Sequence, residues 1–158
     1  MIVSIEDFRN EAKIAGLLPV ITEAPEDYQN KAIQFEVLQY IEKYEPLFLD
    51  TLLGDEVASD LTAYSGLRAE AQTCQEYNEL IEAIRIPCAY YISYWYHRSR
   101  IPVNTTIGGV EMQGENGIRA GSSARLTKIW NDMCYLLHRA GYRFKNSELL
   151  HHINNFNL

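Results

Sequence analysis

The chain has 158 residues, of which 47% are hydrophobic and 22% are charged, proportions that are ordinary for a globular protein. A chain of this length buries about two-thirds of its unfolded surface, so we expect a single domain over residues 1–158. A pI near 5.1 and the lack of a dense basic stripe argue against nucleic-acid binding. No apolar run reaches the roughly 18 residues that a membrane span needs, and the first residues do not resemble a signal peptide. We therefore expect a cytoplasmic protein without membrane contact.

The charge is distributed unevenly along the chain. Residues 1–79 have a formal charge of −11 and residues 80–158 have a formal charge of +4, which together give the −7 of the whole chain. Opposite charges on two parts of one protein favour head-to-tail contact between copies. An acidic surface with scattered charges and no such contact is the alternative interpretation.

The most informative stretch runs from Tyr28 to Gly54. Its apolar residues recur every three or four positions, which predicts a helix with one buried stripe. Glu45 and the neighbouring charged residues fall off this stripe, where we expect water to reach them. Gly54 follows the last apolar residue, as glycine commonly does at the end of a helix. Pro46 predicts a kink or break near residues 42–44, because proline removes a backbone hydrogen bond inside a helix. The stripe consists of Ile33, Val37, Leu38, Ile41, Tyr44, Phe48 and Leu52.

The remaining pattern predicts an all-α bundle of about five to six helices. Ser4 and Asp7 match a capping box that opens a short N-terminal helix ending at Gly16, and a linker follows. Ser123 is the expected cap of a later helix that ends at Gly141. The other expected helices span about residues 55–64, 76–98 and 147–156.

The helix over residues 76–98 is aromatic on more than one side. Leu80, Ile84, Cys88, Tyr91 and Trp95 form its main stripe, and Pro87 predicts a kink. Three tyrosines, Tyr90, Tyr94 and Tyr96, lie off that stripe. Two interpretations stay open, since tyrosine suits both a core and an interface: the helix is the most enclosed one, or one of its faces meets a partner.

A Gly-rich stretch over residues 101–122 separates the two long C-terminal helices. It holds five of the nine glycines and shows no helical pattern, and Asn116-Gly117 is a hairpin signal. About twenty irregular residues inside a compact domain usually have a function. We therefore expect a projecting loop or loose hairpin.

The sequence lacks the common patterns of catalysis and cofactor binding. The four histidines have no metal-ligand spacing, and no HExxH, GxGxxG or GxxxxGK[ST] motif occurs. The three cysteines, Cys74, Cys88 and Cys134, form no CxxC pair. Cys88 and Cys134 lie on apolar helix faces, so we expect their thiols to be buried. We therefore expect no metal, no cofactor and no enzymatic activity, although scattered carboxylates could still meet in space.

The order of these parts, and the string YIEKYEPLFLDTLLG at residues 40–54, resembles the head-tail connector proteins of tailed bacteriophages, also called head-completion or adaptor proteins. The resemblance implies a small α-helical protein of phage or prophage origin that assembles as a homo-oligomeric ring under the portal protein and joins the head to tail-completion proteins. The resemblance also allows a ring that forms only when the portal protein is present as a template. The protein would be in the bacterial cytoplasm during assembly and in the virion afterwards.

For a connector, the expected contact residues lie in the loop and on the aromatic face. The loop carries few charges, so we expect protein rather than DNA contact, for example by adding strand-like segments to a sheet edge. The alternative function is a small helical protein-binding or regulatory module without catalytic activity. The contact residues that we expect are Tyr90, Tyr94, Ile107, Val110 and Met112.

Overall fold

The computed structural model describes residues 1–17, 28–100, 118–144 and 154–156. In these ranges the chain forms four α-helices and no strand, so the all-α prediction is confirmed. Four short 3-10 turns accompany the helices: η1 (Ile5–Asp7), η2 (Asn10–Ala12), η4 (Ala69–Ala71) and η5 (Asn154–Phe156). The helices are α1 (Tyr28–Leu53), α2 (Asp55–Ser65), α3 (Gln75–Arg98) and α4 (Ile118–Phe144).

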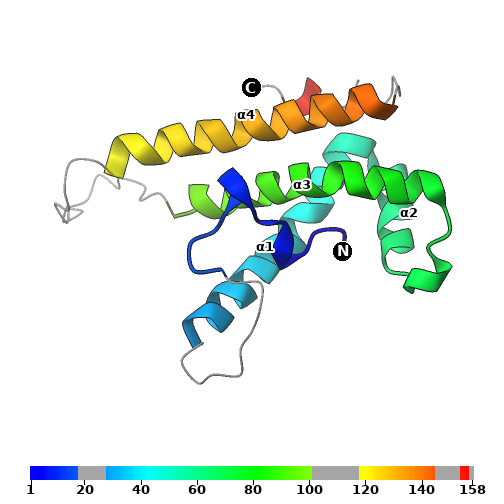
Figure 1. The fold of residues 1–158 in the computed structure, drawn as a ribbon, viewed down its shortest axis with the longest axis horizontal. Helices are drawn as coiled ribbons and strands as arrows, with labels where there is room; N and C mark the ends of the chain where they lie inside the picture. The colour runs from blue at the N-terminus through cyan, green and yellow to red at the C-terminus, as the bar shows by residue number, and fades with distance from the viewer. Residues whose placement is uncertain (18–27, 101–117, 145–153, 157–158) are drawn as a thin grey trace.

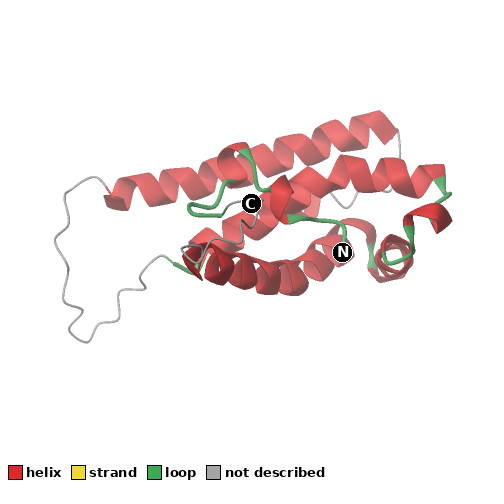
Figure 2. Ribbon diagram, turned by 60° about the horizontal axis from the view of Figure 1, so that its bottom comes forward, coloured by secondary structure: helices red, strands yellow, loops and turns green. Residues whose placement is uncertain are grey.

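Helix α3 is the centre of the fold. Helix α4 lies along it in the antiparallel direction, and α1 packs obliquely against it (Figure 1). Helix α2 packs against α1 and forms a separate corner of the molecule, while η1 and η2 lie across α3 (Figures 1 and 2). No described helix is both long and apolar enough to cross a membrane.

The described chain holds four α-helices rather than five or six. The N-terminal helix predicted up to Gly16 is replaced by the two turns η1 and η2, because Asn10 adopts a left-handed φ of 53° that interrupts a helix. The capping box is present: the Asp7 carboxylate accepts the backbone N–H of Ser4 at 2.8 Å. Of the predicted last helix, only the turn η5 is described.

Helix α4 is longer than predicted at both ends. It begins at Ile118, so Ser123 lies inside the helix and does not cap it, and it continues past Gly141 to Phe144. An interior glycine costs about 1 kcal/mol relative to alanine, which the long contact with α3 offsets. The predicted loop over residues 101–122 is therefore helical from Ile118 onward, and residues 101–117 lie outside the described part.

The two interior prolines do not break their helices. Helix α1 is continuous through Pro46, and α3 is continuous through Pro87. Each proline removes one backbone hydrogen bond, but both helices bury long apolar stripes that hold them in place. Residues 42–44 are helical, so the break that we gave as the alternative to a kink does not occur there, and the kink stays a prediction.

The stripe predicted on α1 forms part of the core. Val37, Ile41, Phe48 and Leu52 are completely buried, and Gly54 ends the helix with a φ of 77°. This conformation is the one for which glycine is preferred. The core also receives Ile84, Cys88 and Ile92 from α3 and Ile129, Met133 and Leu137 from α4.

An aromatic cluster joins α1, α3, α4 and η5. The Tyr44 and Trp95 rings stack with centroids 5.3 Å apart and planes 6° apart, and Tyr91 contacts rings from all three of its neighbouring elements. Such ring pairs contribute about 0.5–1.5 kcal/mol beyond the burial of their area. The members of the aromatic cluster are Tyr40, Tyr44, Phe48, Tyr91, Tyr94, Trp95, Tyr96, Trp130 and Phe156.

Glu45 is buried, which corrects the expectation that water reaches it. Only 6% of the residue is exposed, and its carboxylate accepts the backbone N–H groups of Ile2 and Val3 at 3.0–3.1 Å. Three charge-assisted hydrogen bonds satisfy a buried carboxylate. The N-terminal segment is thus fixed to the middle of α1.

We predict that Leu52→Ala lowers the free energy of unfolding by about 2–5 kcal/mol, because it leaves a cavity at a completely buried position. Leu47→Ala is the matched control on the same helix, since 48% of Leu47 is exposed, and a change within about 0.5 kcal/mol is expected. Urea unfolding followed by circular dichroism measures both. Equal losses in the two variants would contradict the assignment of this core.

We also predict that Glu45→Gln destabilises the protein by about 1–3 kcal/mol. The amide replaces one acceptor oxygen by an N–H₂ donor, so a single uncharged oxygen is left to accept the N–H groups of Ile2 and Val3. The ion pair between the N-terminal ammonium and the carboxylate, 3.9 Å long, is lost as well. Glu42→Gln removes the same charge from an exposed position of α1 and should change the stability by no more than about 0.5 kcal/mol. Thermal unfolding compares the variants, and hydrogen exchange at Val3 should accelerate only in Glu45→Gln. An unchanged exchange rate at Val3 in Glu45→Gln would contradict the attachment of the N-terminal segment to Glu45.

Candidate functional site

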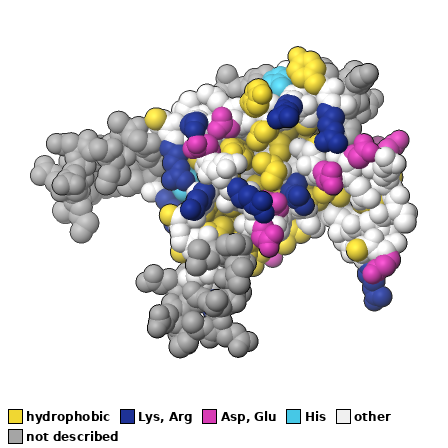
Figure 3. Space-filling view, in the orientation of Figure 1, with side chains coloured by type: hydrophobic (Ala, Val, Ile, Leu, Met, Phe, Trp, Pro, Cys, Tyr) yellow, Lys and Arg dark blue, Asp and Glu magenta, His cyan; other side chains and the backbone are white. Residues whose placement is uncertain are grey.

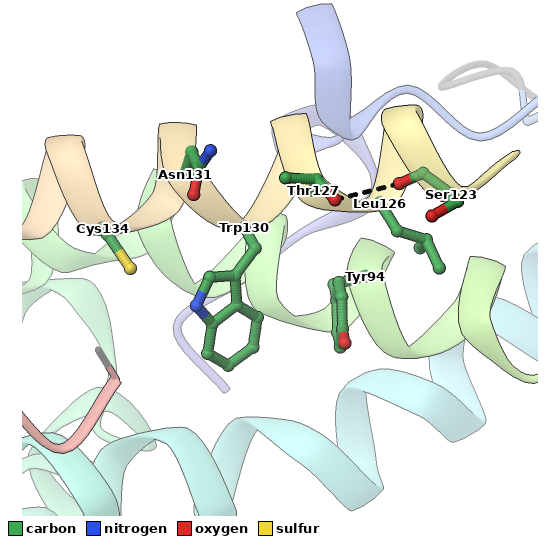
Figure 4. Close-up of a pocket in the computed structure, with 7 residues that line it drawn as sticks. All are labelled: Tyr94, Ser123, Leu126, Thr127, Trp130, Asn131 and Cys134. Carbon is green, nitrogen blue, oxygen red and sulfur yellow. Dashed lines mark hydrogen bonds between the residues drawn. The ribbon is translucent and has the colours of Figure 1, made fainter. Parts of the chain in front are cut away.

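A groove of about 580 Å³ lies between α3 and α4. Of the lining residues that the structure describes, one comes from α3 and six come from α4, and the two aromatic rings point into the same space (Figure 4). The residues that line the groove are Tyr94, Ser123, Leu126, Thr127, Trp130, Asn131 and Cys134.

The helical repeat of α4 creates the two sides of the groove. Ser123, Thr127 and Asn131 are four residues apart and therefore follow one face of the helix. Thr127 donates its hydroxyl to the carbonyl of Ser123 at 3.1 Å, as Figure 4 shows. Leu126 and Trp130 lie on the adjacent face and are half-buried against α3. The groove thus has a polar edge and an apolar floor.

The floor is held in place by contacts with the aromatic cluster and with η5. The Tyr94 and Trp130 rings meet edge to face with centroids 4.8 Å apart. Trp130 donates its indole N–H to the carbonyl of Phe156 at 2.9 Å, and the thiol of Cys134 approaches the same oxygen at 3.6 Å. Because its polar atoms already have partners, the floor presents ring faces rather than hydrogen-bonding groups.

Tyr94 stands at the end of the groove nearest Arg98. The Arg98 guanidinium donates to the Tyr94 hydroxyl at 3.1 Å and lies over the Trp95 ring at 5.0 Å from its centroid. A cation held against aromatic faces in this way orders exposed rings. Tyr94 is therefore positioned before any partner arrives.

The groove is suited to contact rather than to acid–base chemistry. Among the described residues, no carboxylate, histidine or lysine lines it. Burial raises the pKa of the Cys134 thiol, so Cys134 stays protonated near neutral pH and is a weak nucleophile. Within the described ranges, no three His, Cys, Asp or Glu residues are grouped so that they could hold a metal ion.

The structure separates the expected contact residues into three groups. Tyr94 lines the groove, whereas Tyr90 is only 5% exposed and is packed inside the chain. Tyr96 is 1% exposed, so the interpretation of α3 as the most enclosed helix fits two of the three off-stripe tyrosines. Ile107, Val110 and Met112 lie outside the described residues.

Sequence reasoning predicts a buried thiol at Cys134 and did not find the groove. The available signal was the polar series Ser123, Thr127 and Asn131 directly beside Trp130. This series shows that one side of the tryptophan faces water. It does not show that Tyr94 of α3 lies opposite.

No protein-family model, no curated protein and no solved structure matches the chain. The functional conclusion therefore depends on the groove, on the surface charges and on the sequence string at residues 40–54.

Near the end of α3, His97 is half-buried beside the N-terminal segment and α4. Its ring meets that of Tyr96 at 5.5 Å between centroids. Arg125 of α4 donates to the carbonyl of Lys13 at 2.7 Å. Burial, followed by the positive charge of Arg125, lowers the pKa of His97 below its ordinary value of 6.5. Protonation of His97 is thus less favourable in the folded chain than in the unfolded chain.

We predict that His97 makes the fold less stable as the pH falls below about 6.5. In that window the unfolded chain binds a proton that the folded chain does not, so stability decreases until the pH reaches the lowered folded pKa. His97→Gln should flatten part of this slope in urea unfolding at a series of pH values, with His138→Gln as the matched control. An identical slope in His97→Gln and the unmodified protein would contradict the prediction.

Proposed function

We propose that this chain is a structural protein of a tailed phage or prophage, a head-tail connector that forms a homo-oligomeric ring under the portal and docks tail-completion proteins. It acts without catalysis, in the bacterial cytoplasm during assembly and then in the virion. The sequence string at residues 40–54 is one support for this proposal.

The groove is the observation that best supports an assembly role. Exposed aromatic and arginine side chains are enriched in protein interfaces, and here Tyr94, Trp130 and Arg98 come together at one position. Because their rings are already ordered, a partner that docks there loses little additional conformational entropy. The lining residues that the structure describes include no carboxylate, histidine or lysine, which favours binding over catalysis at this position.

The groove also lies near the helix ends that flank the Gly-rich stretch in the sequence. Helix α3 ends at Arg98, one turn after Tyr94, and α4 begins at Ile118, near the Ser123 end of the groove. The proposed contacts of Ile107, Val110 and Met112 stay predictions, because these residues lie outside the described part of the chain.

A second candidate function is a helical protein-binding or regulatory module outside any phage particle. The groove supports it as well, because an apolar groove between two helices accepts an amphipathic helix. Gene neighbourhood distinguishes the two functions: portal, capsid and tail genes beside this one favour the connector, and their absence favours the regulatory module.

Light scattering after size-exclusion chromatography of this chain mixed with the portal protein from the same gene cluster tests the proposal. The mixture should elute as a complex heavier than the portal alone. Thr127→Arg places a long charged side chain at the exposed edge of the groove and should weaken binding at least about tenfold, which corresponds to about 1.4 kcal/mol.

Gln39→Arg is the matched control, since it adds the same charge at an exposed position of α1 away from the groove. It should bind like the unmodified chain. A chain that never binds the portal would contradict the connector function. If Thr127→Arg leaves portal binding unchanged, the groove is not part of the contact surface.

A further inference from the structure

The outward side of α4 carries an exposed row of aromatic and basic side chains. Tyr135 is 65% exposed and Tyr142 is 75% exposed, and their spacing of seven residues places both on one helix face. Arg139 lies between them, and Arg143 follows. We call Tyr135, Arg139, Tyr142 and Arg143 the α4 ridge.

Within the described part of the chain, the ridge side chains form no ion pair and no contact between rings. Two other basic residues of α4, Arg125 and Lys128, contact the N-terminal segment, and both lie outside the ridge. Arg139 and Arg143 form no ion pair with a described residue, and neither Tyr135 nor Tyr142 meets another described ring. Large exposed aromatic side chains beside arginines are typical of contact surfaces.

An acidic surface of matching chemistry lies where α1 turns into α2. The chain carries no lysine or arginine from Tyr44 to Leu67. Exposed apolar side chains accompany the acids there, since Leu47 is 48% exposed and Val57 is 42% exposed. We call this surface the acidic corner, and it consists of Leu47, Asp50, Asp55, Glu56, Val57 and Asp60.

The two surfaces lie on different parts of the molecule. Helix α4 packs on α3, whereas α2 packs on α1 (Figure 1). Figure 3 shows basic and hydrophobic side chains together along the edge formed by α4 and acidic side chains on the side where α2 lies. A contact between the ridge and the corner must therefore join two different copies of the chain.

We propose that copies of this chain associate head to tail, with the α4 ridge of one copy seated on the acidic corner of the next. This inference rests on the proposed assembly function and assigns the surfaces that carry it. A heterologous contact of this kind closes into a ring when its rotation divides a full turn. Charge complementarity steers the encounter and fixes the register, while the tyrosines, Leu47 and Val57 supply apolar area.

A second copy suits the ridge better than a nucleic acid does. Tyrosine and arginine also bind single strands by stacking and charge, but the chain as a whole carries a charge of −7. A polyanion would meet repulsion from most of the surface. An acidic corner on an identical copy meets attraction at the contact itself.

Sedimentation velocity at low ionic strength, at concentrations up to the millimolar range, tests the contact with three variants. The ridge-reversed chain carries Arg139→Glu and Arg143→Glu, and the corner-reversed chain carries Asp55→Lys and Asp60→Lys. The third variant carries all four substitutions. All four positions are exposed, so circular dichroism should show the same helix content in every chain.

We expect the unmodified chain to associate and each reversed chain to lose at least about tenfold in association constant. The fourfold variant should recover association, because its reversed ridge again meets a corner of opposite charge. Lys31→Glu with Arg68→Glu reverses two exposed charges outside both surfaces and is the matched control, which should associate like the unmodified chain. A strict monomer, or reversed variants that associate normally, would overturn the contact.

Two further outcomes separate this inference from the connector function. Salt-sensitive self-association that the reversals abolish, together with no portal binding, would support the ridge contact and contradict the connector. Portal binding by a chain whose self-association ignores the reversals would support the connector and overturn the ridge contact. A third outcome would also overturn the ridge contact. In it, the unmodified chain does not self-associate but retains fluorescein-labelled single-stranded DNA, and the ridge-reversed chain does not retain this DNA. The ridge would then be a nucleic-acid surface.

Discussion

The packing of rings around Tyr91 is the interaction on which the rest of this structure depends. Tyr91 of α3 meets Phe48 of α1 at 5.5 Å, Trp130 of α4 at 6.2 Å and Phe156 of η5 at 5.9 Å between centroids. Three elements distant in sequence are thereby fixed relative to one helix. Aromatic pairs contribute both buried area and a preferred geometry, so the cluster sets the orientation of α4 as well as its stability. Tyr94, at the edge of the same cluster, therefore faces the groove in a defined position.

Helical periodicity predicted the parts of the fold that local sequence determines. The stripe of α1 and the bounds of α2 and α3 followed from apolar spacing and from Gly54, because helix formation and burial impose the same period. The role of Glu45 was not predictable in this way, since its partners Ile2 and Val3 lie more than forty positions away. A carboxylate off an apolar stripe ordinarily faces water, and only the path of the N-terminal segment buries this one.

The candidate site was predictable in part for the same reason. Tyr94 was identified as an aromatic residue off the main stripe of its helix, but so was Tyr90, which the structure buries. The difference depends on which element covers each side of α3, and no local pattern contains that information. The residue types of Ser123 and Gly141 predict helix ends at these two positions. Packing of α4 on α3 overrides these weak preferences, as tertiary contact commonly does.

We propose that this chain works by assembling with copies of itself on the portal. Electron cryomicroscopy of the portal protein incubated with an excess of the chain tests it most directly. We expect an added ring of helical density beneath the portal in which α4 of each copy meets the α1–α2 corner of the next. Portal particles with no added density, or single copies bound without contact between neighbours, would contradict it.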